Sequence, residues 1–147
     1  MTKLEMFLSG LFLGKLPPLS VSTKANLAKF LPWAFILFGI LGFAAILSAI
    51  FTLNYAEMLA IGMGRIWGMS IPIISLAMIY IITPSIQLVS IAGGYLMLKH
   101  KLLGWQLVFS CTLVTLILHI LYLSFLGLLL DILFFYILFQ VRSYYSL

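Results

Sequence analysis

The apolar middle of this chain is almost free of charge. Between Leu31 and Val141 the sequence contains only five formally charged residues, Glu57, Arg65, Lys99, Lys101 and Asp131. The first four lie in two small groups, and these groups divide the apolar sequence into blocks long enough to cross a lipid bilayer. The fifth, Asp131, stands alone inside a long apolar run, where a carboxylate is costly unless a partner or a function accounts for it.

The composition is that of an integral membrane protein. Hydrophobic residues make up 65% of the sequence and charged residues 7%, whereas charged residues make up about a quarter of a typical soluble domain. The mean hydropathy is +1.27. A chain of 147 residues can hold about four spanning helices of ~20 residues each. Little of it is then left for a separate domain outside the membrane.

These blocks predict an all-α, polytopic membrane protein: a four-transmembrane-helix bundle with a short N-terminal interfacial helix. We expect residues 1–30 to form the amphipathic, interfacial segment and residues 31–147 to form the transmembrane domain. Charged residues and glycines separate the first two spans, and a turn near residues 124–127 divides the last apolar run. The four expected spans are residues 33–53, 70–98, 103–123 and 127–141.

Three local patterns concern helix packing and helix ends. Pro84 interrupts the second expected span and predicts a kink or a tilt there. Before the first span, residues 20–23 offer N-cap candidates for a short basic stretch. In the first span, small residues recur at three- and four-residue spacing and predict a face that another helix can approach closely. These residues are Gly39, Gly42, Ala45 and Ala49.

The basic residues predict the orientation of the chain in the membrane. With four spans, Arg65 falls on one side and the other seven basic residues fall on the opposite side. Because basic residues favour the cytoplasmic side, we expect both termini in the cytoplasm of a prokaryotic cell. A cleaved signal peptide beginning at Lys3 is disfavoured, because Glu5 intrudes and no small-x-small cleavage pattern follows. The seven residues are Lys3, Lys15, Lys24, Lys29, Lys99, Lys101 and Arg142.

Asp131 has a candidate partner in the same apolar run. In an antiparallel helical hairpin with its turn centred on Phe125, residues equally far from that centre lie at similar depth. His119 and Asp131 are each six positions away, so that both lie about 9 Å from the turn. The same geometry predicts a second interhelical polar pair, Ser110 with Gln140.

Several interpretations of His119 and Asp131 stay open. A carboxylate beside an imidazole can hold and pass on a proton, which predicts a proton relay or a cation site. The favoured interpretation is structural, since polar contacts worth ~0.6–2 kcal/mol often do no more than fix the register of membrane helices. His119 is also the candidate ligand for a haem or pigment metal. A second such ligand is lacking, because His100 lies between two lysines at the opposite surface.

The connection between the first two spans, residues 54–69, is expected to be an outer loop with contacts through Glu57, Arg65 and Trp67. Its methionines suggest a Cu(I) site, since thioethers are copper ligands. They lack a regular spacing and a nearby His or Cys, so adaptable packing is favoured and no metal site is predicted. The single cysteine, Cys111, excludes an internal disulfide and a Cys-x-x-Cys redox pair.

Together these features favour a non-catalytic accessory or scaffold subunit of a larger membrane assembly. No Walker loop, His-Glu-x-x-His, Gly-x-Ser-x-Gly or carboxylate cluster occurs, so we expect no enzyme and no cofactor. The scattered basic residues argue against nucleic acid, which leaves the lipid bilayer and either a membrane-protein partner or further copies of the chain. The first alternative is a small proton-coupled transporter or channel subunit that uses Asp131 and His119. The second is a haem- or pigment-binding subunit with His119 as the ligand.

Overall fold

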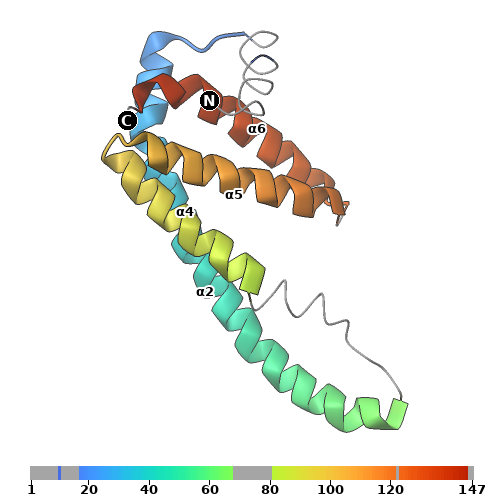
Figure 1. Cartoon of the computed structure of the whole chain (residues 1–147). Helices are drawn as coiled ribbons and strands as arrows, with labels where there is room; N and C mark the ends of the chain where they lie inside the picture. Colours follow the sequence, from blue (N-terminus) through green and yellow to red (C-terminus); the bar gives the residue numbers. More distant parts are fainter. Residues whose placement is uncertain (1–9, 11–16, 68–80, 122, 146–147) are drawn as a thin grey trace.

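The described part of the chain is helical throughout, apart from short connections (Figure 1). The structure is a computed structural model that describes residues 10, 17–67, 81–121 and 123–145, with side chains over the same ranges except residues 49, 50 and 53–67. The helices are α2 (Val21–Trp67), α4 (Thr83–Leu98), α5 (Leu102–Leu121) and α6 (Phe125–Val141), and the short 3-10 helix η2 (Arg142–Tyr144) follows α6.

Helix α2 is longer than expected. Ser20 caps its start, as predicted for residues 20–23, since the Ser20 hydroxyl accepts a hydrogen bond from the Thr23 backbone N–H at 3.2 Å. The helix then continues for 47 residues with Pro32 inside it. The boundary expected between residues 30 and 31 therefore falls inside a helix. Residues 54–67, expected as loop, are also helical, whereas residues 68 and 69 lie outside the described residues.

The physical reason is that glycines and charges weaken a helix without ending it. Gly62 and Gly64 each cost about 1 kcal/mol relative to alanine, but no proline follows Pro32 within α2. In an apolar environment a broken helix leaves backbone N–H and C=O groups without partners, and each such group costs more than a glycine does.

Helix α4 packs along α2 on the predicted small-residue face. A Cβ added at Gly39 would lie 2.5 Å from the Ile91 side chain, and one added at Gly42 would lie 2.7 Å from the side chain of Gln87. The two helices therefore touch at glycine, as the spacing of small residues predicted. Pro84 lies in the first turn of α4, where a proline is tolerated because its missing N–H has no partner in the helix.

Glycine also brings α4 and α5 into contact. The two helices are joined by residues 99–101, and His100 in this connection has a φ of 56°, the left-handed conformation that ends many helices. A Cβ added at Gly104 would lie 2.5 Å from the backbone nitrogen of Met97 and 2.7 Å from the backbone oxygen of Gly93. At this crossing the helices therefore touch backbone to backbone.

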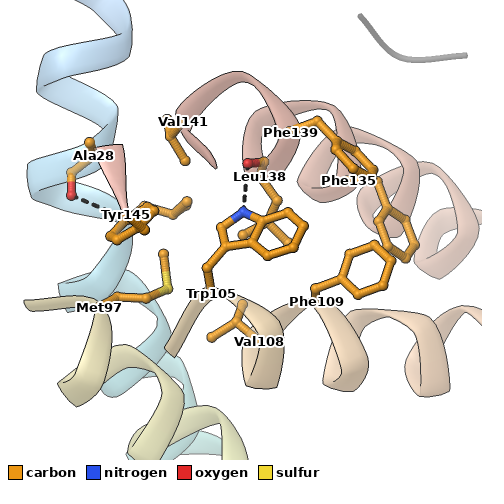
Figure 2. Packing of buried hydrophobic residues seen from close by; sticks show 11 residues of the cluster. Ala28, Met97, Trp105, Val108, Phe109, Phe135, Leu138, Phe139, Val141 and Tyr145 are labelled. Carbon is orange, nitrogen blue, oxygen red and sulfur yellow. Dashed lines mark hydrogen bonds between the residues drawn. The ribbon is translucent and has the colours of Figure 1, made fainter. Parts of the chain in front are cut away.

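Helices α5 and α6 form an antiparallel hairpin whose core lies near the α4–α5 connection (Figure 2). Trp105 is fully buried there and donates its indole N–H to the Leu138 backbone oxygen at 2.8 Å. The Phe109 ring packs edge-on against Phe135, with ring centroids 5.5 Å apart. The core joins α2, α4, α5 and α6 through eleven buried residues: Ala28, Leu31, Met97, Trp105, Val108, Phe109, Phe135, Leu138, Phe139, Val141 and Tyr145.

The hairpin leaves the α2 and α4 pair at an angle, so the described helices do not form a parallel-sided bundle (Figure 1). Helix α6 returns to the N-terminal part of α2, where the Tyr145 hydroxyl donates to the Ala28 backbone oxygen at 3.1 Å. Burial raises the pKa of this Tyr145 phenol to about 12. One further contact joins α2 and α6, because the rings of Phe35 on α2 and Phe134 on α6 lie 5.7 Å apart.

Three helices within the described residues are long and apolar enough to cross a membrane, which is compatible with a multi-pass membrane protein. Helix α4 has 16 residues and is about 24 Å long, shorter than the ~30 Å hydrocarbon core. Residues 70–80 of the expected second span lie outside the described residues, as do residues 1–9 and 11–16 of the expected interfacial segment. The three apolar segments are Val21–Ser48, Leu102–Leu121 and Phe125–Tyr144.

Candidate functional site

The candidate site lies between α5 and α6, in the half of the hairpin that is far from the core. Asp131 is on α6, and its side chain is only 8% exposed. It is the only acidic residue whose side chain the structure describes. His119 lies opposite on α5, and its Nδ1 is 2.7 Å from Asp131 Oδ2. The lone carboxylate of the apolar run is therefore in direct contact with the imidazole.

Thr115 completes the contacts of the carboxyl group. Its hydroxyl lies 3.1 Å from Asp131 Oδ1 and 3.0 Å from the backbone oxygen of Thr112. Thr115 and His119 are four residues apart and so lie on the same face of α5. Each carboxylate oxygen thus has one side-chain partner, which is what a buried carboxylate requires.

Gly127 makes room for the imidazole. A Cβ added at this position would lie 2.5 Å from the His119 ring. Gly127 precedes Asp131 by four residues, so it lies on the α6 face that meets α5. The sequence predicts this glycine in the turn at residues 124–127, and Thr115 is a contact that was not predicted. Both residues could have been found from the sequence, because Gly127 lies four residues before Asp131 and Thr115 lies four residues before His119.

His119, Thr115 and the Thr112 backbone oxygen can satisfy the Asp131 carboxyl group in two protonation states without moving. If Asp131 is ionised, Oδ2 accepts from His119 Nδ1–H and Oδ1 accepts from the Thr115 hydroxyl. If Oδ1 carries a proton, it can donate to Thr115, whose own proton then goes to the Thr112 backbone oxygen. The heavy atoms keep the same hydrogen-bonding distances in both cases. The hydrogen-bonding needs of the carboxyl group are therefore met in either state.

The other side of the imidazole points away from Asp131. The His119 side chain is 35% exposed, and its Nε2 has no hydrogen-bond partner among the described residues. In the neutral tautomer in which Nδ1–H donates to Asp131, Nε2 keeps its lone pair available, which is the arrangement seen in histidines that bind metals. Within the described ranges, however, no three His, Cys, Asp or Glu residues lie close enough together to hold a metal ion.

The prediction of a second interhelical pair, Ser110 with Gln140, is wrong. Ser110 is exposed and donates to the Gln106 backbone oxygen in its own helix at 2.9 Å. Gln140 is buried on another side of α6, where its Oε1 accepts from the Leu19 N–H at 3.4 Å. Equal distance from the turn sets equal depth, but rotation about each helix axis decides which residues meet. Ser110 follows Phe109, which faces α6, and is turned from it by about 100°.

The other residues singled out from the sequence belong to α2 and, in the case of Cys111, to α5. Glu57, Arg65 and Trp67 lie in the last turns of α2 rather than in a loop, and their side chains are outside the described set. Cys111 is buried, with its sulfur 3.6 Å from the Ile86 backbone oxygen, so its thiol is packed away from solvent. No protein-family model, curated protein or solved structure matches this chain.

Proposed function

We propose that the protein is a non-catalytic accessory or scaffold subunit of a larger membrane assembly. The observation that carries the proposal is that one shared core near the α4–α5 connection joins the helices, while the rest of α2 and the α5–α6 hairpin separate (Figure 1). Most of the large apolar side chains of these separated parts are exposed, among them Phe38, Leu41 and Phe51 on α2. Such surfaces offer helix-docking faces to a partner.

One of these faces carries polar groups, which favours a protein partner over lipid alone. Gln106 and Ser110 are exposed on α5, and the Gln106 amide has no hydrogen-bond partner among the described residues. Polar side chains on a membrane helix are commonly satisfied by a neighbouring helix. The five exposed residues at helical spacing form what we call the α5 stripe: Leu103, Gln106, Ser110, Val114 and Ile117.

Site-specific photocrosslinking in native membranes tests the proposal. A photoreactive residue in place of Gln106 or Val114 is expected to give one protein adduct of fixed mass, because both positions lie on the α5 stripe. The matched control is Leu133, which is apolar and exposed like Val114 but lies on α6. A photoreactive residue at this position should give no such adduct. An adduct of twice the chain mass identifies a second copy as the partner. No adduct at the stripe, with a monomer in mild detergent, contradicts the proposal.

We also propose a four-span topology with both termini in the cytoplasm of a prokaryotic cell. Support comes from the basic residues of the α4–α5 connection, which lie at the same end of the molecule as the start of α2 and the end of α6 (Figure 1). Lys29 and His100 line one cavity there, and the Arg142 guanidinium lies 5.2 Å from the centre of the Trp105 ring. To test the topology, Lys101 is replaced by cysteine and treated with a membrane-impermeant thiol reagent. We expect labelling only when the reagent is added from the cytoplasmic side.

A proton-coupled transporter or channel subunit is the second candidate, because the Asp131 site can hold its carboxyl group in two protonation states. Here Asp131 carries the proton and His119 passes it to or from the exposed side of the hairpin. We expect the purified protein to carry protons into vesicles, and we expect this proton flux to be lost in Asp131→Asn. Visible absorbance of the same preparation would instead favour a haem or pigment bound through His119.

A further inference from the structure

A half-open cavity of about 200 Å³ lies between α2 and the α4–α5 connection, far from the Asp131 site. Most of its wall is apolar and includes Trp33 and Met97. Two basic side chains complete the lining: Lys29 on α2 and His100 in the connection. The cavity therefore combines an apolar interior with a basic rim.

Among the described side chains, no carboxylate lies at the basic rim. The only ion pair within the described part of the chain is that of His119 with Asp131, at the other end of the hairpin. The lysines on either side of His100 are exposed, and Lys99 covers the Tyr95 ring at 4.6 Å. A cluster of cations at a membrane surface attracts anionic groups with about 1 kcal/mol for each Lys or Arg. A negatively charged ligand is thus attracted to this rim.

The side chains beside the cavity are of the kind found at the level of lipid headgroups. Trp33 is 61% exposed on α2, and such an amphipathic ring is typical of the boundary between headgroups and hydrocarbon. Leu37 follows one turn further along the same helix and is also exposed. An acyl chain can therefore lie along α2 while the headgroup stays at the level of Lys29.

The backbone holds His100 in place. Its φ of 56° and the bond from its N–H to the Met97 oxygen at 2.9 Å fix the connection. Its ring lies 6.3 Å from that of Tyr145. An imidazole donates at least one N–H in either protonation state, so His100 can hydrogen-bond a phosphate oxygen at any physiological pH.

We propose that this cavity binds an anionic phospholipid, with its phosphate between Lys29 and His100 and an acyl chain along Trp33 and Leu37. The mostly apolar lining favours a lipid over a free phosphate ion, because a small hydrated anion gains nothing from apolar walls. The bound lipid fixes the depth of α2 and the α4–α5 connection in the membrane. None of the α5 stripe residues lines this cavity.

The test measures binding of the purified full chain to phosphatidylglycerol in neutral detergent, with phosphatidylcholine and inorganic phosphate as separate arms. Phosphatidylglycerol is expected to bind and to raise the unfolding temperature. Lys29→Gln is expected to weaken binding about fivefold, the equivalent of one surface cation. His100→Asn, which tolerates the left-handed backbone, should weaken it by a similar factor.

Lys24→Gln is the matched control, because it removes the same charge from α2 at a position that does not line the cavity. Its binding should change less than twofold. Equal losses at Lys24 and Lys29 would mean diffuse surface attraction and would overturn the site. Equal binding of both lipids, or binding of inorganic phosphate alone, would overturn the assignment to an anionic phospholipid.

Discussion

Gly104→Ala is expected to lower the free energy of unfolding by about 3 kcal/mol, because the added methyl group meets backbone atoms. Its Cβ would lie 2.5 Å from the Met97 nitrogen and 2.7 Å from the Gly93 oxygen. Backbone atoms of a helix cannot step aside individually, so α4 and α5 must move apart as units. Chemical unfolding in detergent, followed by the fluorescence of the adjacent Trp105, measures the change.

Gly42→Ala is the matched control for this prediction. Both substitutions gain about 1 kcal/mol of helix propensity, so the difference between them isolates the steric effect. A Cβ at Gly42 meets only the flexible end of the Gln87 side chain, at 2.7 Å, and the protein should lose less than about 1 kcal/mol. Equal losses for the two variants would show that α4 and α5 are not in backbone contact at Gly104.

The hairpin could be predicted from the sequence because the apolar run allowed few alternatives. Between Lys101 and Arg142 the chain is too long for one span and has the length of two. Helices α5 and α6 begin and end within two residues of the expected ranges. The extent of α2 was not predictable from charges and glycines, because in an apolar environment the need for internal hydrogen bonds extends a helix through such residues.

At the candidate site, the sequence indicated which residues share a depth but not which residues face each other. Counting from the turn brought His119 and Asp131 together, and the structure places them 2.7 Å apart. The same count failed for Ser110 and Gln140, since it ignores rotation about the helix axis. The α5 residues that contact α6 are Trp105, Phe109, Thr115 and His119, and this rotation is set by how Trp105 and the core phenylalanines pack.

His119→Leu is expected to destabilise the protein more than Asp131→Leu does. The first substitution leaves a carboxylate that is 8% exposed without its main partner, and breaking a buried pair in this way costs about 3 kcal/mol. The second leaves an imidazole that is 35% exposed and can find other partners, at a cost of about 1 kcal/mol. Unfolding of both variants in detergent measures the difference.

The double variant, in which Leu replaces both residues, separates this explanation from a simple loss of contact. With neither polar group left buried, its stability should return to within about 1 kcal/mol of the original protein. Asp131→Asn should also keep its stability, because the amide can accept from His119 and donate to Thr115. Additive losses in the double variant would contradict the pairing, since independent residues add and coupled residues do not.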